Sequence, residues 1–193
     1  TPSMPLNIPN LLTWARIVLI PLFVGVFYFP PHWLSPHAQN LTATSIFTAA
    51  AVTDWLDGWL ARRLGQTSAF GAFLDPVADK LMVAAALVVL IQLGRADAVA
   101  GIVIISREIS ISALREWMAQ IGAAKSIAVS FVGKLKTAAQ MTSIPILLYA
   151  PADTHPELHL IGAWLLGAAA ALTLWSMAYY LKKAWPEIAA IER

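Results

Sequence analysis

Long stretches without a charged side chain dominate the sequence, and the first runs from Ile17 to Thr53. A helix needs about 20 residues to cross the ~30 Å hydrocarbon core of a membrane, so this stretch is too long for one crossing. The proline-rich segment 30–36 divides it, because proline removes a backbone donor and stops helices. The same argument along the chain predicts six membrane-spanning helices, at about 11–29, 41–60, 73–94, 98–118, 129–149 and 158–181. A six-helix bundle is therefore expected, since a helix satisfies its own backbone hydrogen bonds in lipid.

Composition agrees with an all-α integral membrane protein. Hydrophobic residues make up 59% of the chain and charged residues 12%, about half the ~25% of soluble domains. Disorder, a basic nucleic-acid-binding domain and an ordinary soluble enzyme are disfavoured. The 193 residues predict a single domain over 1–193, in which Thr1–Ser3 ahead of Met4 are interpreted as a tag remnant. Cysteine is absent, which excludes disulfides and cysteine-ligated zinc.

Lysine and arginine residues predict the orientation. With six spans, both termini and two of the loops share one side, and the other side holds Arg95 alone. Because positive residues concentrate in cytoplasmic segments, the first side is expected to be cytoplasmic. Its cations are Arg62, Arg63, Lys125, Lys134, Lys182, Lys183 and Arg193.

Four aspartates stand where the second and third spans meet the cytoplasmic side. Asp54 and Asp57 end one span, and Asp75 and Asp79 open the next. An aspartate at a helix centre in the membrane costs ~2.5–3.5 kcal/mol on insertion scales, so four of them need a reason. Their spacings of three and four residues place each pair on one helix face, and the short connection brings the two faces together. Four converging carboxylates match two divalent cations, Mg²⁺ or Mn²⁺ rather than zinc.

Small residues and an arginine accompany these aspartates. Gly58 and Gly71 lack side chains where a ligand would approach the backbone, Ala61 keeps the same face shallow, and Arg62 is suited to bind a phosphate. The alternative is a helix-end charge cluster held by salt bridges to Arg62, Arg63 and Lys80.

The pattern D-x2-D-G-x2-A-R-x8-G-x3-D-x3-D, from Asp54 to Asp79, resembles the signature of the CDP-alcohol phosphatidyltransferases without a departure. The resemblance implies a six-helix, usually dimeric membrane enzyme that moves a phosphatidyl or related group from a CDP-linked donor to an alcohol and releases CMP. It further implies that Asp54, Asp57 and Asp75 hold metal, and that Asp79 contacts metal and acts as general base. Residues Gly58, Ala61, Arg62 and Gly71 would line the cytidine diphosphate pocket.

Segments 7–16, 106–116 and 133–141 are similar to the bacterial branch of the family that uses glycerol 3-phosphate as acceptor. The implied reaction joins CDP-diacylglycerol and glycerol 3-phosphate into phosphatidylglycerophosphate and CMP, at the cytoplasmic face of the bacterial inner membrane. Asn10, Thr13 and Arg16 are expected to contact the donor phosphates or the mouth of the second helix. The alternative for this segment is that Asn10 caps the first helix and Arg16 extends toward the membrane surface.

An acceptor with two negative charges needs a cationic site near the metals. Four cations lie on the inner half of spans four and five, and we expect Arg107 and Lys136 to bind the phosphate, with Arg115 and Lys134 close by. The alternative is that these cations pair with Glu108 and Glu116 or with anionic headgroups.

Two other functions stay open at this point. A sister enzyme would use phosphatidylglycerol, inositol phosphate or serine as acceptor. A cation transporter would also carry intramembrane carboxylates, although here the acidic residues gather at one face.

Overall fold

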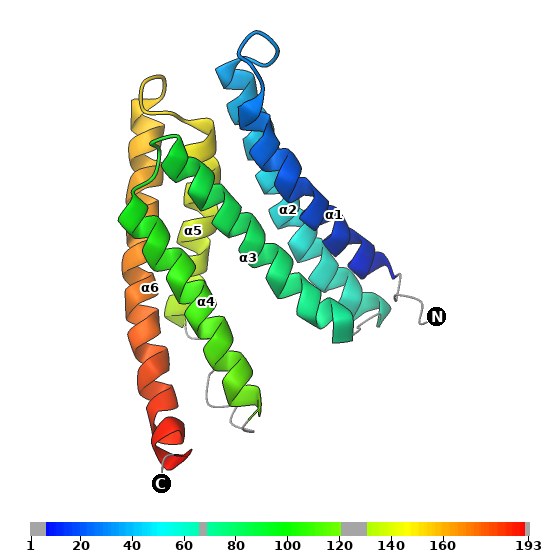
Figure 1. The fold of residues 1–193 in the computed structure, drawn as a ribbon, viewed down its shortest axis with the longest axis vertical. Helices are drawn as coiled ribbons and strands as arrows, with labels where there is room; N and C mark the ends of the chain where they lie inside the picture. Colours follow the sequence, from blue (N-terminus) through cyan, green and yellow to red (C-terminus); the bar gives the residue numbers. More distant parts are fainter. Residues whose placement is uncertain (1–6, 66–68, 121–130, 192–193) are drawn as a thin grey trace.

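The computed structural model describes residues 7–65, 69–120 and 131–191, and these residues form six α-helices, one short 3-10 helix and no strand (Figure 1). The all-α prediction is confirmed. The helices are α1 (Ile8–Gly25), followed by η1 (Val26–Tyr28), α2 (Pro36–Leu64), α3 (Ala69–Gln92), α4 (Ala98–Gln120), α5 (Phe131–Tyr149) and α6 (Pro156–Ile191).

The helices run alternately up and down between the two ends of the bundle. The connections after α1, α3 and α5 all lie at the upper end in Figure 1. The starts of α1, α3 and α5 and the ends of α2, α4 and α6 therefore lie at the opposite end, called the site end below. Helix α1 packs against both α2 and α3, which meet each other over fewer residues, and α6 packs against α4 and α5. The buried core between them includes Phe23, Phe47, Leu87, Leu90, Ile104, Ile144 and Leu147.

Local capping explains where the helices begin and end. Asn7 is the N-cap of α1 and accepts a hydrogen bond from the Asn10 backbone N–H at 2.9 Å, so the idea that Asn10 caps this helix is wrong. Ser35 caps α2, and Gly65 ends it with a φ of 62°, a left-handed conformation that glycine adopts without strain. Helix α6 continues ten residues past the predicted end at Leu181, because a helix does not stop where its apolar stretch stops.

Two of the described helical segments are long and apolar enough to cross a membrane, Ile8–Tyr28 and Pro156–Ile191. The other helices combine apolar stretches with charged side chains; α3, for example, carries Asp75, Asp79 and Lys80 in its first half. Several predictions lie outside the described residues, namely those for Thr1–Ser3, Lys125, Arg193 and the first two residues of the span 129–149.

Candidate functional site

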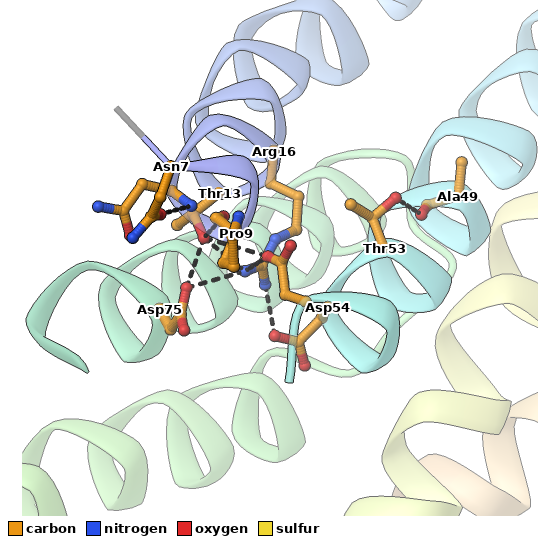
Figure 2. A network of polar contacts seen from close by, with 10 residues as sticks. Asn7, Pro9, Thr13, Arg16, Ala49, Thr53, Asp54 and Asp75 are labelled. Carbon is orange, nitrogen blue, oxygen red and sulfur yellow. Dashed lines mark hydrogen bonds and ion pairs between the residues drawn. The ribbon is translucent and has the colours of Figure 1, made fainter. Parts of the chain in front are cut away.

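An arginine from α1 gathers three of the four signature aspartates at the site end (Figure 2). The Arg16 guanidinium is 3% exposed and lies 2.6 Å from Asp54 Oδ1, 2.7 Å from Asp57 Oδ2 and 3.3 Å from Asp75 Oδ1. Thr13, one turn earlier on α1, lies within hydrogen-bond distance of Asp57 Oδ2 and Asp75 Oδ1, at 3.1 and 2.5 Å. Helix α1 therefore joins the ends of α2 and α3, a role that the short connection between them was expected to fill.

The four signature aspartates, Asp54, Asp57, Asp75 and Asp79, are called the acid cluster below. They differ in exposure: Asp57 is 1% exposed, whereas the side chains of Asp54 and Asp75 are 45% and 42% exposed. Asp79 is exposed and, unlike the other three, forms no ion pair or hydrogen bond with the described residues. The cluster thus combines three carboxylates held by Arg16 with one that is free to meet a ligand.

The acid cluster has the donor chemistry of a divalent-cation site. Asp57 Oδ1 is buried and has no hydrogen-bond partner among the described residues, so this oxygen atom is available to bind a cation. Oxygen donors alone suit Mg²⁺ or Mn²⁺. In the described ranges, no three acidic, histidine or cysteine side chains are close enough together to hold a metal ion. The Arg16 guanidinium contacts three of the carboxylates instead.

Replacing Arg16 with methionine is expected to destabilise the protein by about 3 kcal/mol or more when divalent cations are absent. The change leaves the buried carboxylate of Asp57 without its counter-charge, and breaking a buried ion pair from one side costs about 3–5 kcal/mol. Thermal unfolding of the detergent-solubilised protein in a chelator measures the effect. Arg63→Met is the control, because Arg63 is exposed and stacks on the Trp59 ring. Equal unfolding temperatures for both variants would contradict the central role of Arg16.

A cavity of about 480 Å³, called the polar cavity below, opens beside the acid cluster. Its size is typical of small-ligand sites. Its acidic wall is made by Asp54, Asp75 and Asp79 from α2 and α3. Its opposite wall comes from α4, α5 and α6 and includes Arg107, Glu108, Arg115, Lys136, Gln140 and Tyr180. The cavity therefore has one negative and one largely positive side.

Glu108 organises the positive side. Its Oε1 atom accepts hydrogen bonds from Lys136 Nζ at 2.7 Å and from Arg107 NH1 at 2.9 Å, which ties α4 to α5. We call Arg107, Glu108, Arg115 and Lys136 the basic cluster. The cluster holds three cations and one carboxylate, which is a formal surplus of two positive charges. The alternative that these cations pair with Glu108 is thus true of Arg107 and Lys136. One carboxylate does not neutralise the whole cluster, however.

Helix α6 supports the two arginines of the basic cluster. The Arg107 and Arg115 guanidinium groups lie 5.7 and 5.5 Å from the centre of the buried Tyr180 ring. Arg107 NH2 also donates to Ser176 Oγ at 3.1 Å, and Arg115 NH2 donates to the Tyr180 hydroxyl at 3.3 Å. An aromatic ring this close to two guanidinium groups attracts both, and the contact grows stronger when it is desolvated.

The remaining predicted residues lie outside this cavity. Gly58, Ala61 and Arg62 follow the acid cluster on the last turns of α2, and Gly71 is buried near the start of α3. The Arg62 guanidinium folds back over Gly58, where an added Cβ would lie 3.7 Å from NH1. Lys134 is exposed and does not line the cavity, because it lies on another face of α5 from Lys136.

Comparison with known proteins agrees with the signature. The profile of the CDP-alcohol phosphatidyltransferase family matches residues 6–175. The chain belongs to the CDP-alcohol phosphatidyltransferase family. It is 51% identical, over 94% of its length and 96% of theirs, to proteins of Shigella flexneri serotype 5b and Escherichia coli K12. Both relatives are named CDP-diacylglycerol–glycerol-3-phosphate 3-phosphatidyltransferase.

Sequence reasoning about this phosphatidyltransferase missed two features of the cavity wall, the Tyr180 ring and the unpaired amide of Gln140. Arg16 did carry a signal, because a lone cation inside an apolar helix needs an acidic partner, and its contact with the end of α2 is one of the two that were expected for it. Tyr180 gave no such signal, since aromatic residues are frequent on apolar helices.

Proposed function

We propose that this chain transfers the phosphatidyl group of CDP-diacylglycerol to glycerol 3-phosphate and releases CMP, as part of anionic phospholipid synthesis. The observation that carries the proposal is the two-sided cavity, with the acid cluster on one wall and the basic cluster on the other. The first wall suits a metal-bound diphosphate, and the second suits a phosphate monoester. The names of relatives that are 51% identical over nearly the whole chain support the same reaction.

All six helices are proposed to span the bacterial inner membrane, with the site end facing the cytoplasm. The alternating direction of the helices and the gathering of lysine and arginine residues at the site end support this orientation. The family resemblance favours a homodimer. A second, mainly apolar hollow of about 270 Å³ lies between α2 and α5. It is lined by Phe47, Val52, Trp55 and Pro145, and Met141 lines both this hollow and the polar cavity. The donor's acyl chains would remain in the bilayer beside it.

The acid cluster is proposed to hold two divalent cations, Mg²⁺ or Mn²⁺. Bound there, they would neutralise and polarise the diphosphate of the donor. The donor itself would lie over Gly58, Ala61, Arg62 and Gly71, where the absence of large side chains leaves room and Arg62 supplies positive charge. Asn10 and Thr13 would approach the same group from α1, on which Thr13 already faces the acid cluster.

The basic cluster is proposed to bind the acceptor phosphate. Arg107 and Lys136 are buried and converge on one carboxylate, so they are held ready for an anion, and Arg115 adds a third cation at the cavity wall. A dianion would match their surplus of two positive charges. Lys134, being exposed outside the cavity, would act on the approach of the acceptor rather than on the bound phosphate.

Asp79 is proposed to act as the general base. Its carboxylate faces the cavity, is not held by Arg16 and lies one helical turn beyond Asp75. It would accept the proton of the acceptor's primary hydroxyl as the new oxygen–phosphorus bond forms and the bond to CMP breaks. Positioning and charge neutralisation are expected to supply most of the rate gain, as in other phosphoryl transfers.

An acceptor screen tests the proposed reaction. Purified protein with CDP-diacylglycerol and Mg²⁺ is expected to release CMP with glycerol 3-phosphate, and only weakly with phosphatidylglycerol, inositol phosphate or serine. The reason is that neither serine nor phosphatidylglycerol brings a phosphate monoester dianion to the basic cluster, and inositol phosphate is much bulkier than a three-carbon chain. Faster release with another acceptor would assign a sister activity, and cation flux in liposomes without CMP release would indicate a transporter.

A further inference from the structure

Gln140 places an unpaired amide in the wall of the polar cavity. It lies on α5 one helical turn after Lys136, on the face that also carries Gly133, and all three residues line the cavity. The residue is 4% exposed, yet its side chain forms no hydrogen bond with the described residues, and Oε1 is buried without a partner. A polar group in this position is costly unless something bonds to it.

The neighbouring polar groups do not satisfy this amide. The Thr137 hydroxyl donates to the Gly133 carbonyl at 2.9 Å, and the Ser143 hydroxyl donates to the backbone carbonyl of Gln140, not to its side chain. The next residue along α5 that lines the cavity, Met141, is apolar. The partner of the amide is therefore expected to come from a molecule in the cavity.

We propose that the Gln140 carboxamide binds the secondary hydroxyl of the acceptor and so determines acceptor specificity. A carboxamide offers a donor and an acceptor side by side, and a hydroxyl group also does both. Gln140 follows Lys136 by four residues, which is a rise of about 6 Å along α5. This distance is comparable to the length of a three-carbon phosphate ester. With the phosphate on Lys136 and Arg107, the middle carbon would lie next to the amide and the primary hydroxyl would remain available to Asp79. This inference rests on the proposed function.

Two acceptors that differ only in the secondary hydroxyl test the assignment. Glycerol 3-phosphate and 3-hydroxypropyl phosphate share the phosphate and the attacking primary hydroxyl. The unaltered enzyme is expected to prefer glycerol 3-phosphate by about 10- to 100-fold in kcat/KM, because without the hydroxyl the buried amide stays unpaired. Gln140→Met, which keeps the side-chain length and removes the amide, is expected to bring this ratio close to one and to leave the KM for CDP-diacylglycerol unchanged.

The ratio is measured on one enzyme preparation, so it does not depend on how much of a variant is correctly folded. Thr137→Val is the matched control and is expected to keep the original ratio, because its hydroxyl is already bonded within α5. If Gln140→Met is too slow to measure, Gln140→Asn, with a shorter amide, is expected to give an intermediate ratio.

Equal loss with both acceptors in the Gln140 variants, or a ratio near one in the unaltered enzyme, would overturn the assignment. The failure of the proposed function looks different: the unaltered enzyme would then release no CMP with glycerol 3-phosphate. A structural role for Gln140 lowers both rates together and leaves the ratio as it was, so the two explanations separate.

Discussion

Asp79→Asn is expected to lower CMP release by about 10²–10⁴-fold, because the amide keeps the shape of the side chain but does not accept the acceptor's proton. Among the acid cluster, Asp79 alone has no ion pair or hydrogen bond with the described residues, while Arg16 holds the other three. A base needs a lone pair that no neighbour occupies, and Asp79 has one exposed to the cavity. Turnover with CDP-diacylglycerol and glycerol 3-phosphate measures the change.

A second measurement separates loss of the base from loss of binding. The Asp79→Asn variant is expected to retain CDP-diacylglycerol binding, seen as a rise in its thermal unfolding temperature when the lipid is added. Asp153→Asn is the control, because Asp153 is exposed in the connection before α6, at the other end of the bundle, and should leave turnover unchanged. Full activity of Asp79→Asn would reject this residue as the base.

Removal of divalent cations is expected to abolish turnover, and excess Mg²⁺ or Mn²⁺ should restore it. The acid cluster carries up to four negative charges, of which Arg16 neutralises one, and a diphosphate donor would add more. Like charges at such distances repel strongly without cations between them. A chelator titration followed by CMP release tests this, and activity that survives complete removal of metal would contradict the proposal.

Cation binding also has a readout that does not depend on turnover. Mn²⁺ added to the metal-free protein is expected to raise its unfolding temperature, because a ligand that binds the folded state stabilises it. Asp57→Asn should weaken this response, since Asp57 supplies both a bonded and an unpaired oxygen in the buried part of the cluster. The control Asp97→Asn should not change it, because Asp97 lies at the start of α4, away from the site end.

The observed ion pairs and the proposed metal binding of the acid cluster put opposite demands on Arg16. Without metal, this cation keeps three carboxylates together at 2.6–3.3 Å, and any divalent cation bound to the same oxygens competes with it. Arg16→Met should therefore be less stable in chelator and should recover a larger share of its stability when Mn²⁺ is added. On this proposal, stability and catalysis would use the same oxygen atoms.

Local spacing alone determined much of this protein. Uncharged stretches between prolines and charges predicted six helical segments, and six α-helices occupy them in the described residues, with ends that differ by up to ten residues. The three- and four-residue spacing of the aspartates predicted that each pair shares a helix face, because helix geometry relates nearby residues directly. The family followed from the same pattern.

Only the tertiary structure decided which distant groups meet. Three features depend on how α1, α5 and α6 pack: the pairing of Arg16 with α2 and α3, the contacts of two arginines with the Tyr180 ring, and the unpaired amide of Gln140. Periodicity indicates which face of a helix is polar but not which neighbour covers it, since many packing orders bury the same faces. The 12% of charged residues therefore indicated a candidate site in the sequence, and helix packing decided what each charge contacts.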